Sequence, residues 1–156
     1  MFRSGDGREK IEPKIVRTNG SHILCDFDKC SPEILRSRDT VEDLLLRAAR
    51  LAEATIVASH FHAFSPEGIS GIVLIAESHL SIHTWPSARY AAVDLYTCGE
   101  LDSWPALAAL AQALGSKEPR YAEIHRRSLY EPVAENVRRR PGIDLQKIAL
   151  PSDLHK

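Results

Sequence analysis

The feature that most constrains the fold is a long apolar stretch in the middle of the chain that three polar residues interrupt. Ile69–Ala76 is a near-continuous aliphatic run, as expected of a sheet strand that is covered on both sides. Glu77-Ser78-His79 interrupts the run, and apolar and polar residues then alternate until Pro86 stops the pattern. The sequence therefore predicts two neighbouring strands, the second with a polar and aromatic face.

The segments around this stretch have the signatures of helices and further strands. Apolar residues recur at helical spacing over residues 41–54, and Asp39 or Thr40 can cap this helix. Trp104–Leu114 is rich in alanine and leucine, and Gly115 is its natural terminator. Further strands are predicted at residues 21–28, 55–64, 90–97 and 121–127. Since helices with one apolar stripe must cover a sheet, this order predicts an α+β two-layer sandwich with a largely antiparallel sheet.

Length and charge limit the kind of protein this can be. The chain has 156 residues, 44% of them hydrophobic, and its formal net charge is -1. This balance predicts no nucleic-acid partner, and the lack of any signal-peptide or membrane-length apolar segment predicts a cytoplasmic protein without a membrane partner. Three cysteines without CxxC spacing argue against a disulfide framework. We expect a polar leader at residues 1–19, one domain at residues 20–128 and a peripheral tail at residues 129–156.

Ser78, His83 and Cys98 could together carry out a self-cleavage reaction. A serine hydroxyl becomes a strong nucleophile when a base such as His83 removes its proton. If Ser78 attacks the carbonyl of Glu77, the peptide becomes an ester, and loss of the Ser78 α proton then cuts the chain between residues 77 and 78. The dehydroalanine left behind tautomerises to an imine, which reacts with water and loses ammonia to leave a pyruvoyl group at the new N-terminus.

A pyruvoyl group would make this chain an amino-acid decarboxylase. The ketone forms a Schiff base with an amine and accepts electrons from a breaking carboxylate bond, as pyridoxal phosphate does. The Cys98 thiol can then donate a proton to the carbanion-like carbon. No lysine occurs between Lys29 and Lys117, so the central strands lack an obvious lysine to hold pyridoxal phosphate.

The residues alone also fit less specific interpretations. Ser78 could be an ordinary turn residue between two strands, and Cys98 could be a small buried hydrophobe, as we expect of Cys25 and Cys30. A second class of hypothesis is a metal-binding module with a zinc site of nitrogen ligands. Its ligands would be His60 and His62 with either His79 or His83.

Two segments carry a close resemblance to the prokaryotic S-adenosylmethionine decarboxylase proenzymes: GISGIVLIAESHLSIHTWP at residues 68–86 and YAAVDLYTCG at residues 90–99. The match extends loosely over residues 20–114. The resemblance implies an α+β sandwich that cleaves itself into two chains, a pyruvoyl cofactor derived from Ser78 and no metal. It also implies homodimers of processed protomers whose active sites draw on both.

By this resemblance, Ser70 and His83 assist self-cleavage, Cys98 donates the catalytic proton and Phe64 contacts the substrate. The substrate implied is S-adenosylmethionine, a small cationic amino acid. Its decarboxylated form is the aminopropyl donor for spermidine synthesis.

The sequence departs from the family at Ser87, because Trp85-Pro86 is usually followed there by glutamate. A carboxylate at this position would suit paired ribose hydroxyls as a two-oxygen acceptor, and a serine replaces only part of that hydrogen bonding. The alternative is therefore the same cofactor with arginine or ornithine as the substrate. In either case Phe64 and Trp85 could hold a cation against an aromatic face, although both residues would also fit the core.

Overall fold

The computed structural model describes residues 19–76, 78–98, 101–126 and 137–138. Seven strands form one sheet in the order β2-β3-β4-β5-β1-β6-β7, and every neighbouring pair is antiparallel. The strands are β1 (Gly20–Phe27), β2 (Thr55–Ala63), β3 (Ile69–Ala76), β4 (Ser78–Trp85), β5 (Tyr90–Thr97), β6 (Arg120–Arg126) and β7 (Val137–Arg138). The helices are α1 (Pro32–Arg36), α2 (Arg38–Leu51) and α3 (Trp104–Leu114).

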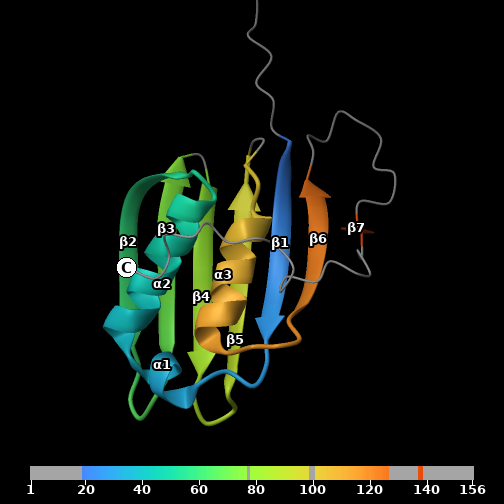
Figure 1. Cartoon of the computed structure of the whole chain (residues 1–156). Coiled ribbons are helices and arrows are strands. Elements are labelled where there is room, and N and C mark those ends of the chain that lie inside the picture. Colours follow the sequence, from blue (N-terminus) through green and yellow to red (C-terminus); the bar gives the residue numbers. More distant parts are fainter. Residues whose placement is uncertain (1–18, 77, 99–100, 127–136, 139–156) are drawn as a thin grey trace, which may run out of the picture.

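The three helices lie across one face of the sheet, as Figure 1 shows, which confirms the predicted α+β two-layer sandwich. Alternate strand residues form the core against them. In β5, for example, Ala91, Val93 and Leu95 are fully buried, whereas the residues between them are half-buried. The opposite face of the sheet, which we call the open face, carries the remaining strand residues.

Close packing at the β2–β3 pair explains the glycine inside the aliphatic run. Phe61 of β2 lies opposite Gly71 of β3 and is buried. A Cβ atom at Gly71 would lie 2.0 Å from the Phe61 ring, so the ring occupies the space that a side chain would need. The glycine thus allows β2 to keep a large aromatic side chain in the core.

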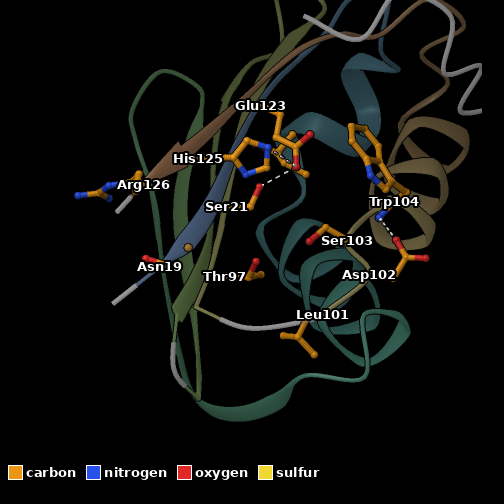
Figure 2. A pocket seen from close by; sticks show the side chains of 12 residues that line it. Asn19, Ser21, Thr97, Leu101, Asp102, Ser103, Trp104, Glu123, His125 and Arg126 are labelled. Atoms are coloured by element: carbon orange, nitrogen blue, oxygen red, sulfur yellow. Dashed lines mark hydrogen bonds and ion pairs between the residues drawn. The ribbon is translucent and has the colours of Figure 1, made fainter. Parts of the chain in front are cut away.

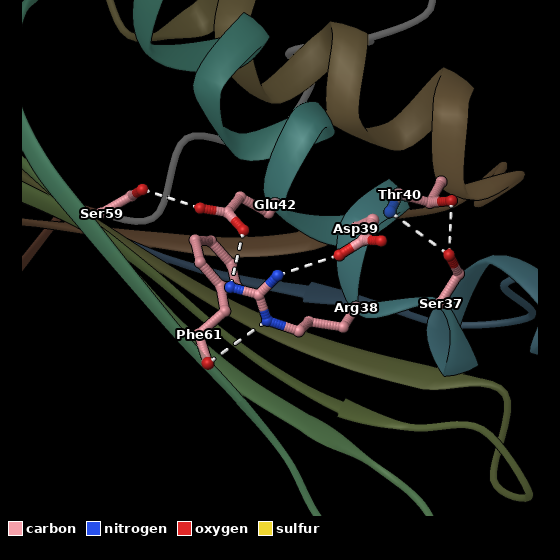
Figure 3. A network of polar contacts seen from close by, with 7 residues as sticks. All are labelled: Ser37, Arg38, Asp39, Thr40, Glu42, Ser59 and Phe61. Atoms are coloured by element: carbon pink, nitrogen blue, oxygen red, sulfur yellow. Dashed lines mark hydrogen bonds and ion pairs between the residues drawn. The ribbon is translucent and has the colours of Figure 1, made fainter.

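The first long helix begins earlier than the sequence indicated. The predicted caps Asp39 and Thr40 lie inside α2, and the N-cap is Ser37, whose hydroxyl oxygen accepts a hydrogen bond from the Thr40 backbone N–H at 3.3 Å. Arg38 then fixes the helix to the sheet (Figure 3): its guanidinium group pairs with Glu42 at 3.0 Å and donates to the Phe61 carbonyl at 3.5 Å. The sequence analysis predicted no helix at residues 32–36, where the short helix α1 begins at Pro32; proline is well suited to the first turn of a helix.

Other predicted details are confirmed or extended. Gly115 caps α3 with a left-handed φ of 78°, and Cys25 and Cys30 are buried in the core. Within the tail, Val137–Arg138 forms a two-residue strand that pairs with β6. None of the helices among the described residues is long and apolar enough to cross a membrane. The cytoplasmic location stays a prediction.

Candidate active site

Ser78 is the first residue of β4, and the sheet brings it next to Cys98. Its hydroxyl oxygen accepts a hydrogen bond from the Cys98 backbone N–H at 2.9 Å. Cys98 immediately follows β5, which pairs with β4 along its length. The fold thus brings the predicted nucleophile and the predicted proton donor together, although 20 positions separate them in the chain. Glu77, the other residue of the predicted cleavage site, lies outside the described residues.

The Cys98 side chain is half-buried and interacts with Tyr96, two residues earlier. A hydrogen bond with the Cys98 side chain, together with burial, raises the pKa of the Tyr96 phenol. The phenol therefore stays protonated near neutral pH and can act as a hydrogen-bond donor beside the thiol.

Ser70 and His83 form a second polar pair on neighbouring strands. They lie directly opposite each other in the β3–β4 register, and the Ser70 hydroxyl is 2.7 Å from His83 Nδ1. A hydrogen bond at one ring nitrogen fixes the orientation of the imidazole, which suits a histidine that has to accept or deliver a proton at the other nitrogen. The structure therefore pairs the two residues that the resemblance assigns to self-cleavage.

The two polar pairs lie apart within one chain. Ser78 and His83 are five positions apart on the same strand, which places their backbones about 16 Å apart at the usual rise of a strand. A general base must come within about 3 Å of the proton that it removes. His83 therefore lies too far along β4 to act on Ser78 of its own chain.

Aromatic side chains surround the Ser70–His83 pair. Trp85 stacks on Tyr90 with a centroid distance of 5.3 Å, and the His83 ring lies 6.2 Å from Trp85. Phe64 packs edge-on against His62 at 4.7 Å. Phe64 and Trp85 are 52% and 48% exposed, so the interpretation of these two residues as core is wrong and both present ring surface to solvent.

The histidines give no support to the metal-binding hypothesis. His60 and His62 lie opposite Ile72 and Ser70, respectively, on β3. His83 Nδ1 already bonds the Ser70 hydroxyl. Among the residues that the structure describes, no group of three or more histidine, cysteine or acidic side chains is placed to hold a metal ion.

Sequence reasoning missed a cluster at the Ser78 end of the open face. Tyr96 lies opposite His79 in the β4–β5 register and opposite His22 in the β1–β5 register, and their rings lie 6.0 and 5.6 Å from its own. The pKa of His22 is lowered, mainly by burial. The charges of His79 and Arg126 also lower this pKa, and Asp94 offsets part of the effect. Asp94 accepts a hydrogen bond from the Ser81 hydroxyl at 3.4 Å.

A cavity of about 390 Å³ lies beside α3 (Figure 2). Its lining includes the nearly buried Glu123, which accepts a hydrogen bond from the Ser21 hydroxyl at 2.9 Å, and Trp104 at the start of α3. Thr97, the neighbour of Cys98 in the chain, also lines it. Of the predicted site residues that the structure describes, none lines this cavity.

Comparison with known proteins points to the same family as the resemblance in the sequence. Residues 21–127 match the protein family described as S-adenosylmethionine decarboxylase. The chain is 48% identical over 109 residues to an S-adenosylmethionine decarboxylase proenzyme of Thermodesulfovibrio yellowstonii, a match that covers 69% of this chain and 80% of the relative. It is 44% identical over 119 residues to the proenzyme of Thermotoga petrophila, covering 76% and 91% of the two chains. The crystal structure of the adenosylmethionine decarboxylase from Aquifex aeolicus superposes with a TM-score of 0.67 and 32% identity, over 77% of this chain and all of that one.

Proposed function

The chain belongs to the S-adenosylmethionine decarboxylase family, and we propose that its Ser78 becomes a pyruvoyl group on which the reaction depends. Its activity is the decarboxylation of S-adenosylmethionine, a small cationic amino acid. The names of these relatives favour this substrate over arginine and ornithine. The product would supply spermidine synthesis.

The surroundings of Ser78 fit self-cleavage. Attack of its hydroxyl on the Glu77 carbonyl forms the ester as the peptide C–N bond breaks and the nitrogen takes up the proton. Loss of the Ser78 α proton then breaks the Cβ–O bond and releases the Glu77 carboxylate. The Cys98 N–H, which points at the Ser78 oxygen at 2.9 Å, would stabilise negative charge on that oxygen when the hydroxyl is deprotonated and again when the Cβ–O bond breaks.

The base that removes the hydroxyl proton of Ser78 would come from a second copy of the chain. His83 cannot reach Ser78 of its own chain, whereas a two-fold dimer across the open face would bring the Ser70–His83 end of one protomer to the Ser78 end of the other. Large apolar side chains are exposed on that face: Leu24 is 38% exposed and Leu74 is 44% exposed. The proposed assembly is therefore a homodimer whose two sites each draw on both protomers.

In the mature enzyme, the group formed from Ser78 would supply an electron sink for the electron pair of the breaking carboxylate bond. Cys98 would deliver the proton that replaces carbon dioxide, and its backbone contact with Ser78 supports this role. Tyr96 would hold the thiol side chain in place. Exposed Phe64 and Trp85 offer flat surfaces for the substrate's adenine or sulfonium group.

The hydrogen bond between Cys98 and Ser78 is the observation that carries this proposal. Release of labelled carbon dioxide from S-adenosylmethionine, arginine and ornithine, compared side by side, tests it. We expect release from S-adenosylmethionine alone, and none from a Ser78→Ala variant. Equal activity of that variant would contradict the role of Ser78.

A further inference from the structure

Tyr96 and Arg126 meet above a strand that lies between their own. Tyr96 belongs to β5 and Arg126 to β6, and β1 separates these two strands (Figure 1). Neighbouring strands lie about 4.8 Å apart, so the two side chains have to reach one another across about twice that distance. The Arg126 guanidinium carbon nevertheless lies over the Tyr96 ring, 4.8 Å from its centroid. This is the geometry of a cation–π contact that spans β1.

Gly20 of β1 leaves the space in which this contact forms. It lies opposite Arg126 in the β1–β6 register, and the next residue, Ser21, lies opposite Thr97 in the β1–β5 register. A Cβ atom at Gly20 would lie 2.7 Å from both Cε2 and Oη of Tyr96. The phenol therefore covers the glycine and occupies the space that any side chain at position 20 would need.

The phenol that lies over Gly20 is hydrogen-bonded to the Cys98 side chain. A cysteine thiol can adopt three staggered positions about its Cα–Cβ bond, whereas a general acid must bring its proton within about 3 Å of the atom that receives it. A fixed phenol selects one of these positions. The positive charge of Arg126 also favours the ionised phenol, which makes the hydroxyl a stronger hydrogen-bond donor to the thiol.

We propose that Gly20 and Arg126 are positioning residues for the decarboxylation: the glycine leaves room for the Tyr96 phenol, and the arginine holds the phenol against the Cys98 thiol. This inference rests on the proposed function, in which Cys98 delivers the proton that replaces carbon dioxide. It adds two residues from β1 and β6 to that step, neither of which touches the reacting atoms.

The first test compares Arg126→Gln with Arg120→Gln. Both variants remove an exposed charge from β6, but Arg120 pairs with Asp26 and Asp28, at 3.6 and 3.2 Å, near the other end of the strand. Mass spectrometry first shows that each chain is cleaved before residue 78, and carbon dioxide release from S-adenosylmethionine then gives kcat and KM. We expect Arg126→Gln to lower kcat about two- to fivefold, the range of an exposed cation–π contact, without changing KM. Arg120→Gln should keep the kcat of the wild type.

A double-mutant cycle shows whether Arg126 acts through the phenol. Tyr96→Phe removes only the hydroxyl and should lower kcat about two- to tenfold, the usual effect of one lost hydrogen bond. In this variant, adding Arg126→Gln should lower kcat no further. Gly20→Ala puts a methyl group where the phenol lies and should lower kcat as Tyr96→Phe does. Arg126→Gln changes an exposed side chain and so tests the same contact without risk to the fold.

The fate of the fragment that begins at residue 78 is a second readout. If the proton reaches the carbon derived from Ser78 instead of the substrate carbon, water releases the substrate as an aldehyde and the substrate nitrogen stays on the chain. The fragment then begins with alanine, which mass spectrometry after turnover detects. We expect more of these alanine fragments per turnover in Arg126→Gln and Tyr96→Phe, because the direction of the thiol decides which carbon it reaches. A general loss of stability would not change this ratio.

The outcomes are distinct. A wild-type kcat and an unchanged share of alanine fragments in Arg126→Gln and Gly20→Ala would overturn the positioning roles and leave the decarboxylase activity intact. The same loss from Arg126→Gln in the wild type and in Tyr96→Phe would show that Arg126 does not act through the phenol. A wild type that releases no carbon dioxide from S-adenosylmethionine would overturn the proposed function and this inference with it.

Discussion

At the scale of single residues, Cys98 contributes to the proposed site through its backbone and, separately, through its side chain. Its backbone N–H holds the Ser78 oxygen, and its side chain interacts with the Tyr96 hydroxyl. The backbone contact survives any side-chain substitution except proline, which has no backbone N–H. Self-cleavage and turnover should therefore respond differently when the thiol is removed.

We expect Cys98→Ala to be cleaved before residue 78 but to turn over about 10²- to 10⁴-fold more slowly, as is usual when a general acid is lost. Gel analysis of cleavage and a carbon dioxide release assay measure the two effects. Cys25→Ala is the matched control, because Cys25 is buried in the core and burial raises the pKa of its thiol to about 12. Full activity of Cys98→Ala would exclude its role as proton donor.

The lowered pKa of His22 makes the stability of the folded chain depend on pH. Burial lowers its pKa below the ordinary value of 6.5, so the unfolded chain binds a proton more readily than the folded one. This contribution to stability is complete above pH 6.5 and is lost as the pH falls below that value. Urea unfolding of His22→Gln between pH 7.5 and about 5 should therefore show a shallower loss of stability than the wild type. Parallel curves would argue against a lowered pKa of the half-buried His22.

At the scale of secondary-structure elements, the packing of β2 on β3 depends on the Phe61 ring, which occupies the space that a side chain at position 71 would need. Gly71→Ala would put a methyl group into the Phe61 ring, and we expect a loss of about 1–3 kcal/mol in the free energy of unfolding, typical of overpacking. Urea denaturation measures the loss. Adding Phe61→Leu should cost less in Gly71→Ala than in the wild type, because the smaller side chain relieves the clash. Additive losses would contradict this packing.

Periodicity predicted most of these elements, the residue types suggested Ser78, His83 and Cys98 as site residues, and the resemblance added Ser70. The sequence could not show which residues face each other across strands. The approach of His22 to Tyr96 depends on the β1–β5 register, and the contact of Glu67 with Ser87 depends on two turns 20 positions apart. The cap of α2 was placed too late because Ser37, Asp39 and Thr40 all suit that position.

At the scale of the whole molecule, the separation of Ser78 from His83 makes the proposed site a property of the dimer. Ser78→Ala lacks the nucleophile and His83→Ala lacks the base, so neither chain should cleave itself at a normal rate. In a mixed dimer, the intact His83 of one chain can act on the intact Ser78 of the other. Co-expression should therefore restore cleavage, and only of the His83→Ala chain.

Mass differences between tagged chains identify which chain is cut. A double variant Ser78→Ala/His83→Ala, co-expressed with His83→Ala, is the control and should restore nothing. Absence of cleavage in verified mixed dimers would show that the base acts within its own chain.

The most direct test of the central claim is denaturing mass spectrometry of the purified wild-type chain. We predict two fragments, residues 1–77 and residues 78–156, the second lighter by one ammonia than a chain that begins with serine. A single mass for the intact 156-residue chain, with an ordinary serine at position 78, would contradict the account.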